Sequence, residues 1–61
     1  MPFITIDLFE GRDKETKREL VQRLTEETCR ILNCKPEAVH IRFNNVKRED
    51  WGTGGVLWSD K

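Results

Sequence analysis

Hydrophobic and polar residues alternate along the first segment of the chain. Ile4, Ile6 and Leu8 fall on one side of an extended backbone. The other side is mixed and holds Phe3, Thr5, Asp7 and Phe9. A period of two with β-branched and aromatic residues predicts a β-strand over Phe3–Phe9, and apolar residues on both sides indicate that both faces are covered. Glu10-Gly11-Arg12 then ends the strand as a turn.

The pattern changes to helical spacing after this turn. Asp13 is a favourable N-cap, because its carboxylate can accept hydrogen bonds from the free amides of a first helical turn. Steps of three and four then relate one stripe of residues: Leu20, Val21, Leu24, Thr28, Ile31 and Leu32. Asn33 can close the helix, and Pro36 opposes its continuation. We therefore expect an amphipathic helix of about twenty residues.

A second alternating segment predicts a strand over Val39–Val46. Val39, Ile41 and Phe43 share one face. The opposite face holds His40, Arg42 and Asn44. After a polar loop and Trp51, the glycine-rich residues 52–55 are typical of a turn, and residues 56–58 can form a short last strand.

Strand, helix and strand in this order predict a β-α-β unit with parallel strands and a right-handed crossover. With no repeat, linker or low-complexity stretch, residues 1–61 are expected to form a single domain. Parallel sheets occur almost only with both faces buried, and one helix can cover only one face. The expected fold class is therefore α/β: one β-α-β unit with a short C-terminal hairpin, completed by oligomerisation.

Composition supports the same expectation. The chain has 61 residues, of which 36% are apolar and 36% charged, and a domain of this size hides only about 60% of its unfolded surface. Two cysteines do not make a disulfide framework, so we expect Cys29 and Cys34 to be reduced thiols, one of them half-buried. With the lone His40 they supply at most three zinc ligands at irregular spacing, so no metal is expected. Self-association is the expected source of the missing core.

The charges narrow the possible partners. Eleven Lys and Arg balance eleven Asp and Glu, which argues against a nucleic-acid-binding module, whose affinity comes mostly from neutralised phosphates. No apolar run exceeds the four residues Met1–Ile4, so no membrane span is predicted. The N-terminus also lacks the basic and apolar segments of a secretory signal. We expect a cytoplasmic protein with neither a nucleic-acid nor a membrane partner.

Pro2 is the residue that points to chemistry. An initiator Met is normally removed when a small residue follows it, and removal of Met1 would leave Pro2 with a free secondary amine. An α-amino group titrates near 8, and burial or a nearby cation lowers that pKa toward neutrality. Such an amine can act as a general base at working pH. The alternative is that Pro2 only begins an edge strand.

Three motifs in order make the chain resemble the 4-oxalocrotonate tautomerase family over its full length. They are Met1-Pro2, Leu8-Phe9-Glu10-Gly11-Arg12 and Trp51-Gly52-Thr53-Gly54-Gly55. The resemblance implies that Pro2 moves a proton between carbon and oxygen, or between two carbons, of an enol or ketone. It implies that Arg12 binds a substrate carboxylate, for which a forked, permanently charged guanidinium is suited, and that Trp51 walls the pocket and keeps it dry. It also implies dimers with joined four-stranded sheets, three of which form a hexamer.

His40 departs from the family pattern. The best-studied members carry a second arginine here, which grips the other polar end of the substrate from a neighbouring subunit. Histidine is shorter, only fractionally charged at pH 7, and cannot form a bidentate fork. Arg42 faces the same way, roughly 6.6 Å further along the strand, and can take over this role. Whether His40 or Arg42 replaces the second arginine stays open. The alternative that His40 is only a hydrogen-bonded interface residue stays open as well.

The sequence thus predicts a cofactor-free enol–keto tautomerase or isomerase of a small unsaturated 2-hydroxy or 2-oxo carboxylic acid. Its expected catalytic residues are Pro2 and Arg12, and its expected substrate-binding residues are His40, Arg42 and Trp51. Two alternatives remain. One is a non-catalytic oligomeric scaffold or binding module that retains the fold. The other, inside the family, is a dehalogenase or hydratase.

Overall fold

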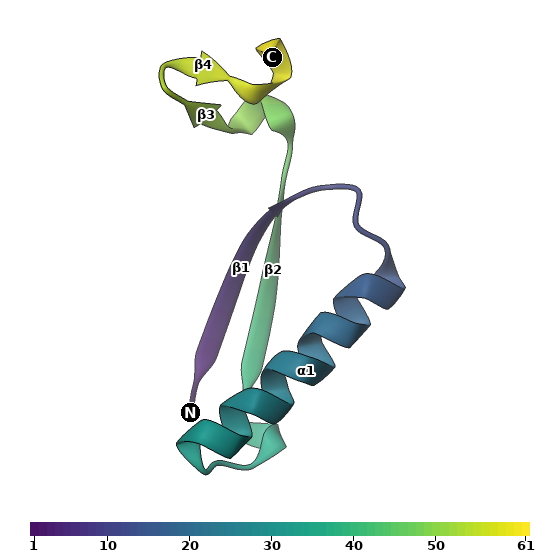
Figure 1. Ribbon diagram of the computed structural model, residues 1–61, viewed down its shortest axis with the longest axis vertical. Coiled ribbons are helices and arrows are strands. Elements are labelled where there is room, and N and C mark those ends of the chain that lie inside the picture. Colours follow the sequence, from purple (N-terminus) through teal and green to yellow (C-terminus); the bar gives the residue numbers. More distant parts are fainter.

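The computed structural model describes residues 1–61 and consists of a two-stranded sheet, one long helix and a small C-terminal hairpin (Figure 1). Strand β1 spans Phe3–Phe9, helix α1 spans Lys14–Leu32 and strand β2 spans His40–Val46. The hairpin consists of β3 (Gly52–Thr53) and β4 (Val56–Leu57). Short 3-10 turns occupy three further segments: Pro36–Ala38, Arg48–Asp50 and Trp58–Asp60. The predicted β-α-β unit with a C-terminal hairpin is confirmed.

Strands β1 and β2 are parallel, with Phe3 opposite His40 and Phe9 opposite Val46. Second-strand pairing begins at His40 and not at Val39, because the amide of Val39 is bonded to the carbonyl of Pro36 in the preceding 3-10 turn. The hairpin strands are antiparallel, and Gly52 and Thr53, predicted as part of a turn, are paired with β4. The strand β4 is also one residue shorter than expected.

Helix α1 covers one face of the sheet, as expected of a single helix, whereas the cover predicted for both faces is not met within one chain. The side chains of Ile4, Ile6 and Leu8 are half-buried on this face. Lys17 of α1 places its Nζ 2.8 Å from the Oδ1 of Asn45 and 5.6 Å from the centre of the Phe43 ring. These contacts fix α1 over the side of β2 that carries its odd-numbered residues.

Both ends of α1 follow from local chemistry. The Asp13 carboxylate accepts a hydrogen bond of 2.8 Å from the backbone amide of Thr16, which is the expected N-cap. At the other end Asn33 adopts the left-handed conformation, with φ 55° and ψ 51°, and closes the helix. Asparagine tolerates this conformation better than most residues, so the sequence specifies the C-terminus of α1 as well as its start.

The predicted apolar stripe of α1 is only partly covered. Leu20, Leu24 and Thr28 are half-buried, as expected. Ile31 and Leu32 are 64% and 59% exposed, so the stripe does not reach its predicted extent within one chain. A sheet of two strands about 4.8 Å apart is narrower than the helix that lies on it, which is about 10 Å across. Residues on the flanks and last turn of α1 therefore have no sheet beneath them.

The opposite face of the sheet is covered only at its far end, where residues of the C-terminal segment pack on Phe9. Phe3 is 72% exposed although its ring stacks on His40, with ring centroids 5.1 Å apart. Further along the same face, the side-chain amide of Asn44 donates a hydrogen bond of 2.8 Å to the Asp7 carboxylate. Thr5 and Arg42, which pair across the two strands on this face, are exposed as well, whereas the last pair, Phe9 and Val46, is half-buried.

The chain encloses no core of its own. None of its 61 residues is buried. Its extents are 43 × 23 × 13 Å and its radius of gyration is 14.7 Å, whereas a compact chain of this length has about 10.5 Å. The exposed surface is 5018 Å², against about 4,100 Å² for a compact monomer of this mass. The C-terminal segment extends beyond the end of the sheet (Figure 1).

Candidate active site

Pro2 lies at the end of the sheet where both long strands begin. Its carbonyl accepts a hydrogen bond of 3.0 Å from the backbone amide of His40, which extends the β1–β2 ladder by one step. Pro2 is half-buried and precedes Phe3, whose ring stacks on the imidazole of His40. The sheet therefore places the predicted base beside His40, one of the three residues predicted to bind substrate. The stacking of Phe3 was not predicted, and only the strand register could have revealed it.

Met1 adds nothing to this arrangement. Its side chain is 77% exposed, so its removal would uncover no apolar surface that the chain buries. The hydrogen bond that fixes Pro2 uses the carbonyl of Pro2 and leaves its nitrogen outside the ladder. Loss of Met1 would thus expose the secondary amine and keep the start of β1 in place.

Arg12 lies at the opposite end of the sheet. Gly11 has φ +112°, a conformation that L side chains rarely adopt, and so turns the chain away from β1. The amide of Glu10 donates a hydrogen bond of 3.0 Å to the carbonyl of Val46 and closes the ladder just before this turn. Arg12 is exposed and forms no ion pair, so its guanidinium is free to bind an anion.

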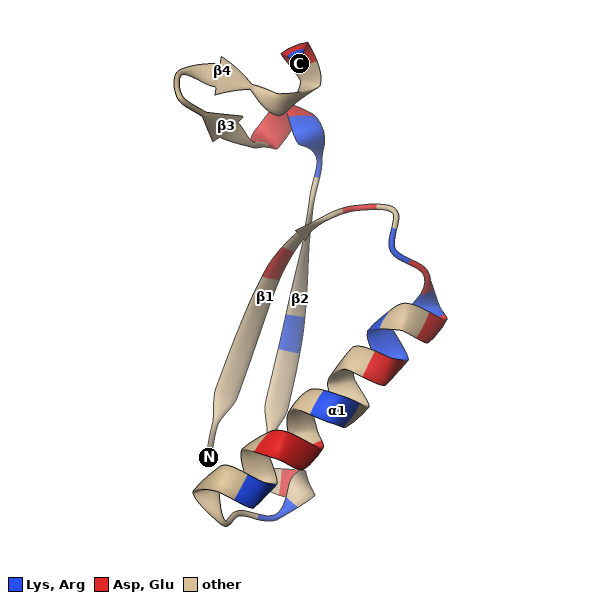
Figure 2. Cartoon of the chain, viewed as in Figure 1, with Lys and Arg blue, Asp and Glu red and all other residues tan.

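Arg42 projects from the middle of β2 on the uncovered face of the sheet, the face that also carries His40. Charges gather on α1 and the turns, whereas each long strand carries one charged residue (Figure 2). The charge on β1 is Asp7, which Asn44 already hydrogen-bonds. Arg42 makes no ion pair, so the uncovered face presents one unpaired guanidinium.

Trp51 belongs to an aromatic cluster at the far end of β1. Its ring centroid lies 4.8 Å from that of Phe9, and the ring centroid of Trp58 lies 5.0 Å from that of Phe9. The guanidinium of Arg48 stands 4.6 Å from the centre of the Phe9 ring. This cluster attaches the C-terminal segment to the end of β1. Of this cluster only Trp51 was predicted as a site residue, although Phe9, an aromatic residue next to Asp7 on the mixed face of β1, was a signal.

Within one chain four of the five predicted site residues form two separate groups, and Arg42 lies between them on β2. Pro2 and His40 lie at the start of the sheet, while Arg12 and Trp51 lie beyond its end. The seven residues of β1 span about 23 Å at 3.3 Å per residue, which exceeds the length of a small carboxylic acid. A single chain therefore cannot bring Pro2 and Arg12 to one substrate.

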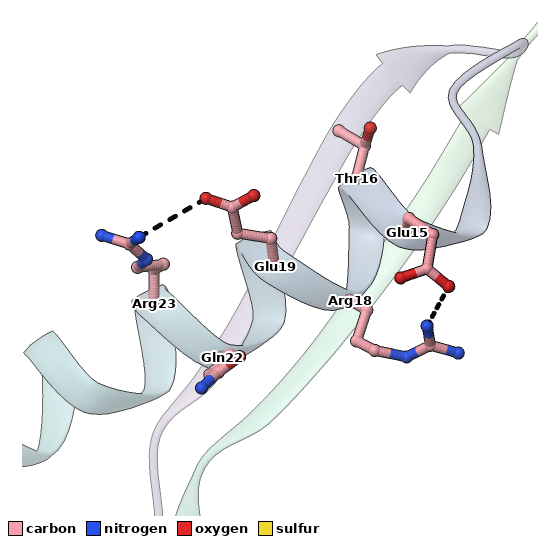
Figure 3. Close-up of a pocket in the computed structure, with 6 residues that line it drawn as sticks. All are labelled: Glu15, Thr16, Arg18, Glu19, Gln22 and Arg23. Atoms are coloured by element: carbon pink, nitrogen blue, oxygen red, sulfur yellow. Dashed lines mark hydrogen bonds and ion pairs between the residues drawn. The ribbon is translucent and has the colours of Figure 1, made fainter.

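The surface hollows of the single chain agree with this separation. The largest hollow lies on the outer face of α1 and is lined only by polar residues: Glu15, Thr16, Arg18, Glu19, Gln22 and Arg23 (Figure 3). Two ion pairs cross it, Arg18 with Glu15, and Arg23 with Glu19 at 3.6 Å. It has no hydrophobic wall and contains none of the five predicted residues. None of the other hollows contains one either.

Comparison with known proteins gives a consistent result. A sequence model of the family described as "Tautomerase enzyme" matches residues 2–61. A probable tautomerase of Listeria monocytogenes is 40% identical over 60 residues, covering 98% of both chains. One from Halalkalibacterium halodurans is 34% identical over 61 residues, covering 100% of both.

Solved structures are equally similar. The crystal structure of a 4-oxalocrotonate tautomerase homologue shares 48% identity and a TM-score of 0.94, covering 100% of this chain and 97% of the other. A heterohexameric 4-oxalocrotonate tautomerase from Chloroflexus aurantiacus shares 25% identity and a TM-score of 0.89, covering 98% and 97%. The same fold thus recurs over the whole length of the chain.

No helix of the chain has the length and apolar character that a bilayer crossing requires.

Proposed function

Because the chain belongs to the tautomerase family and so has tautomerase-type isomerase activity, we propose that Pro2 is its general base. The substrate class is a small unsaturated 2-hydroxy or 2-oxo carboxylic acid, and no cofactor takes part. One observation carries this proposal: the family match begins at Pro2, and the sheet holds Pro2 beside His40 with its nitrogen outside the ladder.

The chemistry is a proton transfer within one conjugated substrate. After removal of Met1, the neutral secondary amine of Pro2 takes a proton from the enol hydroxyl or from carbon. It returns that proton to another carbon of the same conjugated system. A cation close to the amine disfavours its ammonium form, so Arg42 and the charge of Arg12 would keep the amine neutral near pH 7. The amine is then a base matched to its working pH.

Arg12 binds the substrate carboxylate, and it does so from another copy of the chain. The distance of about 23 Å along β1 separates Pro2 from Arg12 in one chain, and the uncovered sheet face and free edges offer surfaces for other copies. We infer that strands of two chains join into a four-stranded sheet and that three such dimers form a hexamer. In that assembly the Arg12 of one chain can lie beside the Pro2 of another.

The remaining two roles concern charge and water. Negative charge develops on the substrate oxygen as the enolate-like transition state forms, and a positioned donor stabilises it. His40 and Arg42 both face the side of the sheet on which such a donor is needed. Trp51 is half-buried against Phe9 and offers an apolar wall that excludes water.

The experiment that tests this function uses the Met-trimmed oligomer, whose intact mass confirms the free proline. Tautomerisation of unsaturated 2-hydroxy acids is followed by ultraviolet absorbance with wild type and with Pro2→Ala. We expect at least a 100-fold fall in kcat/KM for Pro2→Ala, since general-base catalysis contributes about 10²–10⁴-fold.

Pro36→Ala is the matched control, because it removes the other proline, which lies inside the chain and cannot provide a free amine, and it should keep wild-type rates. Equal rates for wild type and Pro2→Ala would refute the proline mechanism and favour a non-catalytic scaffold. Halide release or hydration without tautomerisation would assign the chain to the dehalogenase or hydratase alternative.

A further inference from the structure

The C-terminus of α1 brings two cysteines together. Cys29 lies in the last turns of α1, and Cys34 follows Asn33 directly. The amide of Cys34 donates a hydrogen bond of 3.3 Å to the carbonyl of Cys29, across the left-handed residue Asn33. This pattern is a Schellman motif, in which the side chains of the two bonded residues pack against each other. Here both positions are cysteine, and the two Sγ atoms lie 3.9 Å apart.

The pair has the geometry of a reduced disulfide. A disulfide bond is about 2.05 Å long, so the sulfur atoms need to approach by about 1.9 Å. The shift is small enough for side-chain rotations, since the backbone hydrogen bond already holds the two residues side by side. Both thiols are half-buried and therefore still reachable from solvent in the chain. No third His, Cys, Asp or Glu completes a metal-binding cluster with them.

We propose that Cys29 and Cys34 form a reversible dithiol–disulfide site whose reactant is a small-molecule disulfide of the glutathione type. The site lies at the end of α1 and does not involve Pro2 or Arg12. It is therefore independent of the tautomerase function, and each can fail without the other.

The exchange balances in two steps. The Cys34 thiolate attacks one sulfur of the small disulfide, that S–S bond breaks, and one small thiolate leaves with a proton from the medium. The Cys29 thiol then loses its proton and attacks the Cys34 sulfur of the mixed disulfide. The second small thiolate leaves and takes up a proton. Two electrons pass from the cysteine pair to the reagent, which becomes two thiols.

The order of attack follows from the surroundings of the two sulfurs. Desolvation raises the pKa of the Cys29 thiol, and its hydrogen bond and charge interaction with Cys34 raise the pKa further. Glu37 of the following 3-10 turn acts in the same direction. The thiolate is the nucleophile in disulfide exchange. Cys29 is thus the poorer first nucleophile and suits the second, intramolecular step.

The bond would close a short loop of residues 29–34 at the end of α1. A cross-link removes conformational freedom from the unfolded chain, although a short loop gains less than a long one. We expect the oxidised protein to unfold at a temperature higher by roughly 5 °C. Adding dithiothreitol should return the oxidised protein to the lower unfolding midpoint of the reduced form.

The test uses the whole oligomeric protein and oxidised glutathione as the reagent. At equilibrium we expect a mass lower by two hydrogen atoms, no glutathione adduct, and loss of both iodoacetamide-reactive sites. Peptide mapping without reduction should join Cys29 to Cys34 in one chain. Stable adducts on both cysteines, bridges between chains on a non-reducing gel, or no reaction at all would each overturn the proposal.

Two single variants separate the roles. In Cys29→Ser the first step remains but the second is lost, so the glutathione adduct on Cys34 should accumulate. In Cys34→Ser adduct formation on Cys29 should be slower than in Cys29→Ser. Equal rates in both variants would overturn the assigned order of attack. Tautomerisation rates of both reduced variants should match wild type.

Discussion

At the scale of single residues, the arginines of this chain differ sharply in how they are engaged. Arg18, Arg23 and Arg30 are paired with glutamates on the outer face of α1, and exposed pairs of this kind contribute little. Arg12 and Arg42 have no such partner. Arg48 has no ion pair either, but its guanidinium lies 4.6 Å from the centre of the Phe9 ring. This leaves Arg12 and Arg42, which the family resemblance and the strand register direct toward a substrate, so function is to be sought there.

Replacement of Arg12 tests the carboxylate anchor. We expect Arg12→Ala to lower kcat/KM by roughly 10- to 100-fold, mainly through a higher KM, because a hydrogen-bonded charge pair with the substrate is lost. Steady-state kinetics with one carboxylic acid substrate measures the change. Arg23→Ala is the control, since it removes an arginine that pairs with Glu19 on the outer face of α1. An unchanged KM in Arg12→Ala would contradict the anchor role.

The second polar contact can be assigned by comparing two neighbouring residues. His40→Arg restores the fork of the family pattern, so we expect kcat/KM for a dicarboxylic substrate to rise about tenfold relative to a monocarboxylic one. Arg42→Ala should then matter less in the His40→Arg background than in wild type. If substrate preference stays constant in all three variants, neither residue contacts the second polar end.

At the residue scale the sequence predicted candidate site residues but not the contacts between side chains on the same sheet face. It singled out Pro2, His40 and Arg42, because type and spacing are visible in the chain. It missed the stack of Phe3 on His40 and the hydrogen bond from Asn44 to Asp7. Both contacts depend on the register between β1 and β2, which pairs residues 37 positions apart in the sequence and leaves no local signal.

At the scale of elements, helix α1 is defined by its two ends. Asp13 and Asn33 cap it in the predicted way, because caps rely on local hydrogen bonds that a sequence specifies. The extent of the buried stripe was wrong for Ile31 and Leu32, which are exposed. How far a helix is covered depends on the width of the surface beneath it, and that width is a property of the assembled sheet.

The N-cap makes stability depend on pH in a defined direction. Hydrogen bonds from Thr16, first its side chain and then its backbone amide, lower the pKa of Asp13 below its usual value. The folded pKa is below the unfolded one, so the cap contributes fully above the unfolded value, near 4. The contribution is lost as the pH falls through the folded pKa.

We therefore expect Asp13→Ala to lower the unfolding midpoint by roughly 5 °C at pH 7. This difference should shrink in acid below pH 4, where wild type also loses its charged cap. Thermal unfolding followed by circular dichroism over a pH series measures both effects. Asp13→Asn is the matched control, because asparagine caps well without titrating. A constant difference between wild type and Asp13→Ala at all pH values would contradict this account.

At the scale of the whole molecule, the shape of the chain is unfavourable for a monomer. It buries none of its residues, leaves one face of its sheet uncovered, and extends a hairpin away from the rest. The low apolar content and the β-α-β pattern predicted this incompleteness. The arrangement of further copies could not be predicted from residue pattern, because it depends on complementarity between surfaces.

Solution mass tests the proposed assembly. Six chains of 7.2 kDa give a particle of about 43 kDa, which light scattering coupled to size exclusion can measure. Phe3→Asp places a charge on the uncovered sheet face, and we expect it to dissociate the particle, since an unpaired buried charge is costly. Gln22→Asp on the outer face of α1 should not. A wild-type mass of one chain would contradict assembly altogether.

The central claim is that assembly makes the Pro2 amine a base matched to neutral pH. The direct measurement is a nuclear magnetic resonance titration of the Met-trimmed protein with ¹⁵N-labelled proline, set beside the pH dependence of kcat/KM. We predict that the Pro2 nitrogen titrates below the usual α-amino value near 8 and that activity rises with pH through the same midpoint. A Pro2 nitrogen with an ordinary pKa, or an activity profile that ignores its titration, would contradict the account.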